Sequence, residues 1–535
     1  MAQLLYNRGV TESAQVEPFI RADRELLYDP FLLCDMERAV ARIEAALRSG
    51  ETISIYGDFD ADGVTATAIL VDGFSALGGR VIPYIPRRTE EGYGLNNAAL
   101  ETLKGDGVGL VITVDCGISS APEVERANEI GLDVIVTDHH TVPSQMPPAV
   151  AVVDPKRGDS CYPFPDLAGV GVAFKLLQAL YYSLGRDDDL DQYLDLVALG
   201  TVTDMSPLVG ENRYLVKHGI EALQRTERPG LLELARSAGI PVAGIDPEVI
   251  SWVLGPRLNA AGRLDHAMRS YNLLATDSVE EAQRIASWIE RKNSQRQALT
   301  EGVLADARAK VEAQGTDQPL LMVGGEGYPS GVVGVVAGRL SEAYYRPVIV
   351  CEIGAEQVRG SARSIPEFDV TAALTQCCDL LSRFGGHPMA AGFTAPLENL
   401  GPLHHRLLEI AQAHLAGLDL RRSIAIDAQV RLDTLGGGAF SMMQRLAPFG
   451  RANPLPTFLS RGVAVEECRC VGGKGEHLKL KIRTNNVVWD TIGFRQGYLV
   501  GEVTPTIDIV YNLQVDQWSG GERLQLNMLD FAPRA

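Results

Sequence analysis

Three aspartates stand at alternate positions in the stretch ISIYGDFDADGV, residues 53–64, and a glycine follows the last of them. An EF-hand calcium loop also begins D-x-D-x-D-G, but it ends with a glutamate at its twelfth position and is flanked by helices. Counted from Asp58, the twelfth position here is Ile69, and the preceding TISIY alternates β-branched residues as strands do. The stretch is therefore not this type of calcium loop, and its carboxylates indicate a different site.

Further acidic residues and histidines come at the ends of other predicted strands and helices. VITVDCG ends a strand at Asp115, VIVTDHH ends another at Asp138, His139 and His140, and LGTVTDM offers Asp204. A single aspartate at a strand end is more often a helix cap or a loop residue, and DFDADG alone would suit a solvated turn. Four such clusters in one chain favour a metal site instead. The candidate ligands and their neighbours are Asp58, Asp60, Asp62, Asp115, Asp138, His139, His140 and Asp204.

This mixture of carboxylates and imidazoles sets the expected metal. Oxygen and nitrogen ligands together suit borderline divalent ions such as Mn²⁺, whereas histidine makes Mg²⁺ less favoured. So many anionic ligands can hold two ions about 3.5–4 Å apart, with one carboxylate bridging them. Bound cations would then offset the repulsion among the carboxylates.

The predicted elements that carry these residues alternate between strand and helix in the first part of the chain. That alternation predicts a mainly parallel sheet with helices on both faces, where ligands gather at the carboxyl ends of the strands. Mostly helical sequence follows, and a long helix over 279–314 is expected to act as a spacer between two lobes. A second α/β unit comes next, in which residues 369–385 are expected to form one helix. From about residue 421, short strands with turns predict a small barrel of the oligonucleotide-binding type.

Composition and charge narrow the class of protein. The chain has 535 residues, of which 46% are hydrophobic, and this is enough for several cores. Its net charge of −19 taken alone argues against a nucleic-acid partner. From Ile424 onward, however, 12 lysines and arginines accompany 11 aspartates and glutamates, whereas the rest of the chain has 37 against 57. The C-terminal fifth is therefore electrostatically different, and site carboxylates inflate the negative count elsewhere.

Targeting and redox features indicate a cytoplasmic protein. No basic start followed by an apolar run opens the sequence, so no signal peptide is expected. No uninterrupted stretch of about 18 apolar residues occurs, so we expect no membrane span and no membrane partner. The eight cysteines form no C-x-x-C pair and are expected to be reduced thiols.

The ordered motifs resemble a known family. DFDADG, VDCG, DHH and VTDM are similar to the four ordered motifs of the DHH phosphoesterase superfamily. Within it, the chain resembles the RecJ single-strand DNA exonucleases through IPRRTEEGYGLN, AGVGVAFKL, GPRLNAAGR, NSQRQ, RGSARS, GGHPMAAGF and PFGRANPLP. The resemblance covers the chain from about Asp29 onward. It implies two α/β lobes, the DHH and DHH-associated domains, joined by a long helix and followed by a C-terminal oligonucleotide-binding (OB) barrel. The expected domains are 1–275, the connecting helix 276–317, 318–420 and 421–535.

The resemblance also implies a reaction. Members of the family cleave single-stranded DNA from its 5′ end to mononucleotides with Mn²⁺ or Mg²⁺, in recombination and repair. Single-strand-binding protein and a helicase are natural partners of such an enzyme, and a monomer is the expected state. An alternative is a DHH enzyme for short oligoribonucleotides or small phosphates, whose members are generally shorter and lack the barrel. A non-catalytic replication scaffold of this fold would have lost motif residues, and here they are all present.

Carried over position by position, the resemblance assigns metal ligands. Asp60 and Asp115 would bind one ion. Asp62, Asp115, His139 and Asp204 would bind the other, so that Asp115 bridges the two. A bridging water would then be deprotonated and attack phosphorus while the cations stabilise the developing charge.

The neighbours of these ligands receive supporting roles from the same resemblance. His140 would contact the scissile phosphate, and Asp138 would orient nearby groups. Asp58 is either a ligand or a partner of one. Several members have histidine where Tyr56 stands, so the first metal is expected to have one protein ligand fewer. The family usually has histidine where Pro329 stands, which weakens any catalytic role for that loop.

Phosphate contacts are expected from basic and hydroxyl side chains in the other motifs. In RGSARS, Ser361 and Arg363 follow a glycine, so a hydroxyl, an amide and a guanidinium can converge on one terminal phosphate. Arg88 and Arg257 resemble further phosphate contacts of the family, although each would equally suit an ion pair. His387 in GGHPMAAGF would either meet a phosphate or belong to a tight glycine-rich turn.

The segment EHLKLKIR, residues 476–483, predicts a nucleic-acid-binding strand. Its period of two places cations on one face and aliphatic side chains in the barrel core. The polar face would consist of His477, Lys479, Lys481 and Arg483. It would follow a single-stranded backbone while Trp489 or Phe494 stacks on bases, although a solvated strand face has the same pattern.

Overall fold

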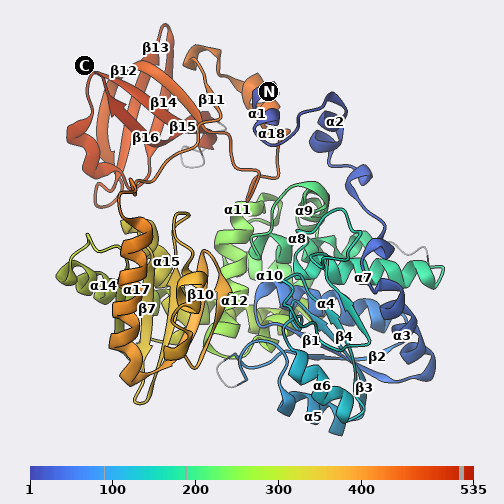
Figure 1. Ribbon diagram of the computed structural model, residues 1–535. Helices are drawn as coiled ribbons and strands as arrows, with labels where there is room; N and C mark the ends of the chain where they lie inside the picture. Colours follow the sequence, from blue (N-terminus) through green and yellow to red (C-terminus); the bar gives the residue numbers. More distant parts are fainter. Residues whose placement is uncertain (89–90, 187–189, 517–522, 535) are drawn as a thin grey trace. The chain divides into compact units, whose positions relative to one another are not determined.

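The computed structural model describes residues 1–535 except 89–90, 187–189, 517–522 and 535 (Figure 1). The chain divides into two compact units. The first comprises Met1–Gly255, Tyr271–Ala282 and Ile424–Ala535, and the second comprises Pro256–Ser270 and Gln283–Ser423. Among the described residues, no helix combines the length and apolarity that crossing a bilayer requires.

The first unit contains a parallel sheet, as the alternating pattern predicts. Its strand order is β2-β1-β3-β4-β5, and every neighbouring pair is parallel. The strands are β1 (Thr52–Gly57), β2 (Arg80–Tyr84), β3 (Val108–Val114), β4 (Asp133–Thr137) and β5 (Ala151–Val153). Because all five run the same way, their carboxyl ends meet at one edge. The motifs that follow β1, β3 and β4 are therefore brought together.

Helices cover both faces of this sheet. One face packs against α5 (Asn97–Gly105) and α6 (Ala121–Glu129), and the core there includes Val111, Val134, Leu100 and Val124. The other face packs against α4 (Ala61–Ala76) and α7 (Gly169–Ser183), with α3 (Met36–Ser49) beside α7. Both α4 and α7 are apolar on nearly every side and are buried for most of their length, as expected for helices enclosed by others.

A helical segment and the N-terminal residues complete this part of the unit. The N-terminal helices are α1 (Ala2–Tyr6) and α2 (Ser13–Arg21), and the later ones are α8 (Leu194–Thr203), α9 (Gly210–Leu223), α10 (Pro229–Ser237) and α11 (Pro247–Val249). The next helix, α12 (Gly255–Leu264), belongs almost wholly to the second unit, and α13 (Met268–Ala275) is divided between the two units. A buried ion pair links α7 to α9, with Lys175 Nζ 2.9 Å from Glu211 Oε1. Lys175 also donates to the carbonyl of Tyr28 at 2.6 Å, and this ties the N-terminal segment to the helices.

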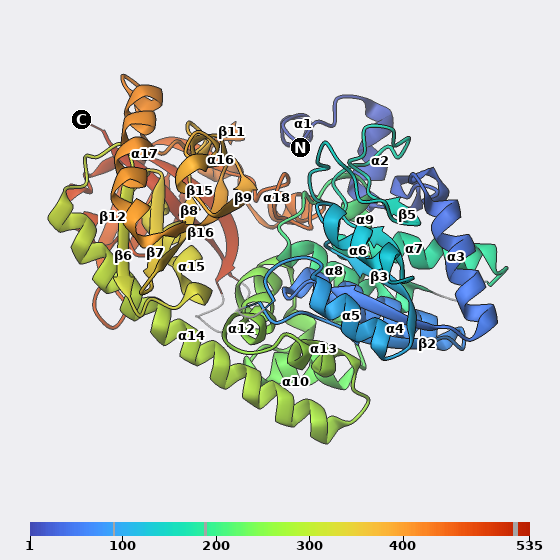
Figure 2. The same cartoon turned by 60° about the horizontal axis from the view of Figure 1, so that its bottom comes forward.

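The predicted long helix is confirmed as α14 (Val279–Gln314), which Figure 2 shows as one continuous helix. At 1.5 Å per residue, its 36 residues extend over about 54 Å. The second unit then forms a mixed sheet in the order β6-β7-β8-β10-β9, in which only β6 and β7 are parallel. Its strands are β6 (Leu321–Glu326), β7 (Val348–Ile353), β8 (Gln357–Arg363), β9 (Arg383–His387) and β10 (Ala390–Pro396), and its helices are α15 (Ser330–Tyr344), α16 (Val370–Thr375) and α17 (Leu400–Leu415).

The prediction of one helix over 369–385 is wrong. The helix α16 ends at Thr375, a short 3₁₀ turn follows at Cys378–Leu380, and Arg383–His387 form strand β9. This strand pairs with β10, and the sheet therefore overrides the helical pattern of the sequence.

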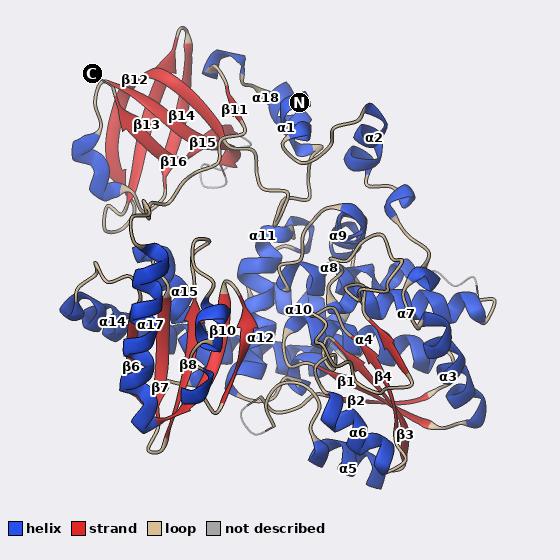
Figure 3. Ribbon diagram, in the orientation of Figure 1, coloured by secondary structure: helices blue, strands red, loops and turns tan. Residues whose placement is uncertain are grey.

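The C-terminal part of the first unit is a closed barrel (Figure 3). The five long strands run in the order β12-β13-β14-β16-β15, and β15 pairs back with β12. They are β12 (Phe458–Val471), β13 (His477–Thr484), β14 (Val487–Gly493), β15 (Thr506–Asp516) and β16 (Arg523–Pro533), and they are preceded by β11 (Ala428–Gln429) and α18 (Gly437–Gln444). The predicted alternation of β13 is confirmed, because Leu478, Leu480 and Ile482 are buried in the barrel core.

The stacking role predicted for Trp489 is wrong. Its side chain faces the barrel core with only 7% of the residue exposed, and its indole N–H donates to the carbonyl of Leu432 at 3.1 Å. Alternation along β14 places Trp489 and Thr491 inward. Phe494, in contrast, is 44% exposed and remains available for a base.

Candidate metal centre

The loop after β1 delivers two aspartates to the beginning of α4. Asp60 is the N-cap of this helix, and its side chain accepts hydrogen bonds from the amides of Asp62 and Gly63 at 2.9 and 3.2 Å. Asp62 accepts from the amides of Gly169 and Val170, at the start of α7, at 2.7 and 2.8 Å. Amides at helix N-termini favour negative charge. Two different helices therefore hold these carboxylates in place.

Two further carboxylates lie beside this helix start. Asp58 directly follows β1, and a Cβ added to Gly63 would lie 2.6 Å from the Asp58 backbone, so the turn requires glycine at that position. Asp115 directly follows β3 and has φ of +61°, a left-handed conformation that is uncommon for a residue other than glycine. Such backbone conformations cluster at functional sites. Asp58 and Asp115 are 5% and 3% exposed.

Asp138 organises the end of β4. Its Oδ1 accepts from the amides of His139 and His140 at 2.7 and 3.2 Å and lies 2.7 Å from His140 Nδ1, and its Oδ2 accepts from the amide of Ile118 at 2.9 Å. Burial opposes its ionisation, but the contacts with His140 and these amides hold the pKa of Asp138 below its usual value. Burial also disfavours a charged His140, but Asp138 raises the pKa of His140 to about 9. Asp138 therefore favours the charged form of His140.

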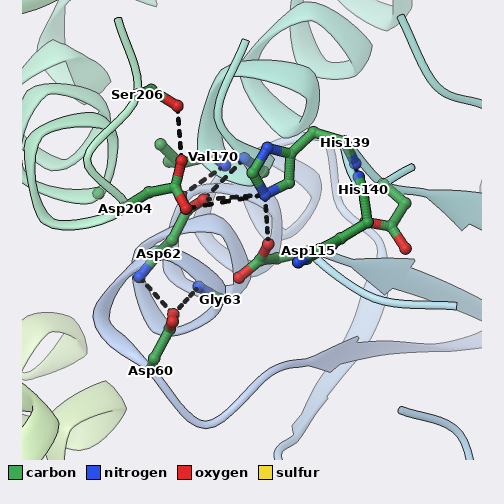
Figure 4. A network of polar contacts seen from close by, with 12 residues as sticks. Asp60, Asp62, Gly63, Asp115, His139, His140, Val170, Asp204 and Ser206 are labelled. Carbon is green, nitrogen blue, oxygen red and sulfur yellow. Dashed lines mark hydrogen bonds and ion pairs between the residues drawn. The ribbon is translucent and has the colours of Figure 1, made fainter. Parts of the chain in front are cut away.

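The side chains from these separate elements converge on His139 (Figure 4). Its Nε2 lies 3.0 Å from Asp115 Oδ1, 3.9 Å from Asp62 Oδ2 and 3.9 Å from Asp204 Oδ1. In each of three overlapping sets, donor atoms lie within 4.8 Å of one another: Asp115, His139 and His140; Asp62, His139 and Asp204; and Asp58, Asp60 and Asp115. The sequence predicted this meeting of distant motifs, and the structure brings together every residue it proposed as a metal ligand.

The chemistry of this cluster fits divalent cations. The buried atoms His139 Nε2 and Asp58 Oδ1 make no hydrogen bond with any described residue. Burial and mutual repulsion raise the pKa of Asp58, Asp62 and Asp115 well above the usual range. Burial lowers the pKa of His139 to about 4, which keeps its imidazole neutral, as a metal ligand must be. Cations placed among these donors would remove the repulsion and fill the unused lone pairs.

Several neighbours of the cluster escaped the sequence reasoning. Tyr93 Oη lies 3.3 Å from His140 Nδ1, and the two rings meet edge to face with centroids 5.8 Å apart. The Tyr93 ring also meets Phe59, and the guanidinium of Arg88 lies 4.9 Å from the centroid of that phenyl ring. Lys156 Nζ donates to the carbonyl of His139. Tyr93 stands in the quoted motif IPRRTEEGYGLN, but its type alone did not distinguish it from a core aromatic.

The position of Tyr56 has a structural explanation. The residue is fully buried, its ring stacks on Tyr84 at 5.0 Å, and its hydroxyl donates to the carbonyl of Gly94 at 3.1 Å. Its side chain therefore belongs to the core between the sheet and α5.

The predicted phosphate contacts outside the first unit lie on several elements of the second. On β8, Arg363 donates to Ser361 Oγ at 3.2 Å, so these two side chains do come together. Arg257, on α12, has its Nε 2.6 Å from Glu290 Oε2. His387 ends β9, and its carbonyl accepts from Thr371 Oγ1 at 2.7 Å. Pro329 is the N-cap of α15.

Acidic partners accompany the cationic face of β13. Lys481 Nζ lies 2.8 Å from Glu467 Oε1, and Arg483 Nε lies 2.6 Å from Glu466 Oε1, both on β12. Lys479 lies opposite Arg469 in the strand register. Two of the three strong cations are therefore paired across the strands.

Comparisons with known families and relatives agree with this architecture. The model of the DHH family, N-terminal domain, matches residues 52–201, that of the DHHA1 domain matches 317–413, and that of the RecJ OB domain matches 426–530. The single-stranded-DNA-specific exonuclease RecJ of Bacillus subtilis is 39% identical over 536 residues, which cover 99% of this chain and 68% of that protein. Its counterpart from Escherichia coli is 31% identical, over 98% of this chain and 94% of that protein.

A solved structure supports the same relationship. The crystal structure of RecJ in complex with Mn²⁺ from Thermus thermophilus superposes with a TM-score of 0.85 at 33% identity, and the match covers 100% of this chain and 76% of that one. A structure of the same protein in complex with Mg²⁺ gives a TM-score of 0.81. The ordered motifs, the fold, the three domain matches and the full-length relatives agree, and the chain belongs to the RecJ family of single-stranded-DNA-specific exonucleases.

Proposed function

We propose that this chain degrades single-stranded DNA from its 5′ end to 5′-mononucleotides by hydrolysis at two divalent cations, Mn²⁺ or Mg²⁺. The observation that carries the proposal is the convergence of Asp62, Asp115 and Asp204 on the buried Nε2 of His139. The setting is DNA recombination and repair in the cytoplasm, with single-strand-binding protein and a helicase as partners and the chain as a monomer.

The side chains divide between two adjoining cation positions. Asp58, Asp60 and Asp115 would hold one cation, and Asp62, Asp115, His139 and Asp204 would hold the other. Asp115 groups with Asp58 and Asp60 and lies 3.0 Å from Nε2 of His139, which in turn groups with Asp62 and Asp204. The two cations, when bound, would activate a water molecule and neutralise charge on the phosphate. Asp60 and Asp62 need little reorganisation for this, because helix N-termini already orient them.

The remaining groups at this edge act on the phosphate. His140, whose charged form Asp138 favours, would donate to a non-bridging oxygen of the scissile phosphate, where negative charge increases during the reaction. Asp138 is a positioning residue, because it contacts both backbone amides and the ring of the histidine pair. Arg88, beside Phe59, would contact a neighbouring phosphate.

The other proposed contacts belong to separate parts of the chain. Ser361 and Arg363 would bind a terminal 5′-phosphate, with Arg257 and His387 on nearby phosphates of the strand. Lys479, Lys481 and Arg483 on β13 would follow the backbone of a longer strand. The proposed domains are the DHH domain, 1–275, the connecting helix, 276–317, the DHH-associated domain, 318–420, and the OB barrel, 421–535.

One nuclease assay tests the proposal. The full chain with Mn²⁺ is incubated with single-stranded DNA, RNA and blunt duplex that carry a label at either end, beside Asp115→Ala and the surface control Asp106→Ala. We expect mononucleotides from the 5′ end of single-stranded DNA and loss of activity only in Asp115→Ala. Release from the 3′ end, equal attack on duplex, or a preference for dinucleotides over long strands would overturn it.

A further inference from the structure

The path of the main chain after α8 decides where the carboxylate of Asp204 points. Asp204 is the C-cap of α8, and its Oδ2 accepts from Ser206 Oγ at 2.5 Å. Met205 between them has φ of +65°, in the left-handed region. Residues 204–209 are here called the Asp204 loop. The end of α8 supplies part of what holds this conformation, because the amides of Met205 and Ser206 donate to the carbonyls of Val202 and Thr201 at 3.2 and 3.3 Å. A non-glycine residue still adopts this conformation at some cost, so further contacts matter.

Further contacts come from a segment almost 250 positions later in the chain. The turn 450–453, here called the pre-barrel turn, precedes β12. Arg451 NH1 donates to the carbonyl of Met205 at 3.1 Å, and the carbonyl of Arg451 accepts from the amide of Leu208 at 2.8 Å. A Cβ on Gly450 would lie 2.6 Å from Leu208 Cδ1, so the two segments pack closely. The pre-barrel turn therefore holds the Asp204 loop on both sides of Ser206.

The pre-barrel turn is itself firmly built. The backbones of Gly450 and Asn453 exchange hydrogen bonds at 2.9 and 3.2 Å. Asn453 is fully buried, and its amide group donates to the carbonyls of Leu446 and Pro448 at 2.9 and 2.7 Å. The turn can therefore act as a fixed support.

A buried arginine joins this support to the helix that follows the Asp204 loop. Arg213, on α9, is fully buried and donates to the carbonyls of Leu446 and Ala447 at 2.9 and 2.7 Å. It also donates to the carbonyl of Phe19 at 2.6 Å. The segment that leads into the barrel is thus attached to both ends of the loop that carries Asp204.

We propose that Arg451 is a positioning residue for the metal centre, acting on Asp204 through the carbonyl of Met205. The inference rests on the proposed metal role of Asp204. The guanidinium–carbonyl hydrogen bond adds to the backbone hydrogen bonds at the end of α8 that keep Met205 in its left-handed conformation, and this conformation aims the Asp204 carboxylate at His139. The segment that leads into the barrel then helps to set cation affinity, in addition to any role of the barrel in binding DNA.

The test measures Mn²⁺ binding to the full-length chain without DNA, by titration with detection of free Mn²⁺. Removing a direct hydrogen-bond partner of a metal ligand typically weakens metal binding by about 10- to 100-fold. Arg451 contacts the neighbouring residue Met205 and not Asp204 itself, so its effect should be smaller. We therefore expect Arg451→Ala to weaken binding by about 3- to 10-fold, and Arg451→Lys to recover part of the loss. The control is Arg445→Ala, an exposed arginine at the end of α18 that makes no hydrogen bond to the Asp204 loop among the described residues.

Two outcomes would overturn the inference. Unchanged Mn²⁺ affinity in Arg451→Ala, beside a clear loss in Asp204→Ala, overturns the role of Arg451 and leaves the metal centre intact. Unchanged affinity in Asp204→Ala overturns the metal assignment and the inference with it. If Arg451→Ala lowers the melting temperature strongly, it is replaced by Arg451→Gln, which keeps most of the aliphatic stem. We then expect the same weakening of Mn²⁺ binding at an unchanged melting temperature.

Discussion

Two regions of the molecule share one sequence pattern but differ in burial and in charge pairing. They are the carboxyl edge of the parallel sheet that carries the proposed metal ligands, here called the metal edge, and the cationic face of β13. Each places three like charges at alternate positions: Asp58, Asp60 and Asp62 in one, and Lys479, Lys481 and Arg483 in the other. At the sheet edge, Asp62 and Asp115 are nearly inaccessible, and burial and repulsion raise the pKa of both. On β13, in contrast, the cations are partly exposed, and Glu466 and Glu467 lie beside two of them.

The difference shows what each region can do. A buried cluster of like charges destabilises the fold until a ligand of opposite charge arrives, so it is poised to bind cations strongly. Exposed paired charges contribute little to stability, and they exchange partners easily when a phosphate approaches. The metal edge is therefore expected to be decisive for chemistry, whereas β13 is expected to adjust the affinity for long strands.

The largest expected effect comes from neutralising Asp115, the carboxylate that we propose as the bridge between the two cations. Asp115→Asn should lower hydrolysis of single-stranded DNA by at least about 10³-fold, because a cation contact in the transition state is lost. The same change should stabilise the metal-free protein by on the order of 1 kcal/mol, because it removes one charge from a repulsive cluster. Steady-state kinetics and thermal unfolding in chelator measure the two effects. A lower melting temperature of the metal-free variant would contradict this account of the edge.

The second-largest expected effect is stabilisation by Mn²⁺, which should protect the metal edge and not β13. Mn²⁺ at a hundred times its dissociation constant should raise the free energy of unfolding by about 2.7 kcal/mol. Hydrogen exchange should show the added protection at the amides after β1, β3 and β4, and none along β13. Equal protection of the barrel strands would show that the two regions are not independent.

A smaller effect is expected from removing the cations of β13 together. Lys479→Ala, Lys481→Ala and Arg483→Ala combined should weaken binding of a long single strand by about tenfold or more at low salt, and should reduce the salt slope by about 2. Cleavage of a short oligonucleotide at saturation should remain near wild type. Binding titrations at several salt concentrations give the slope, and an unchanged slope would place the DNA on another face of the barrel.

The smallest effect is expected from releasing one cation from its partner. Glu467→Gln removes the charge beside Lys481 and should raise affinity for a long strand by about two- to threefold at low salt, with little change at high salt. Asp530→Asn, elsewhere on the barrel, serves as the charge-matched control. Weaker binding by Glu467→Gln would mean that the pair orients Lys481 and does not mask it.

Several elements of this fold could be predicted from local periodicity in the sequence. The alternation of β13, the parallel sheet of the first unit and the whole extent of α14 follow from repeats of two or 3.6 residues, and such repeats are visible among neighbours in the chain. The order of the acidic motifs likewise indicated that they meet at one edge, because parallel strands share their carboxyl ends.

Only the tertiary structure decided features that depend on residues far apart. It broke the predicted helix 369–385 by pairing β9 with β10, and it turned Trp489 into the barrel core. It also made Asp62 an acceptor for the start of α7 and brought Arg451 to the carbonyl of Met205. Each of these depends on which partner lies opposite in the folded chain, and the energy of such long-range contacts outweighs local propensity while leaving no periodic trace in the sequence.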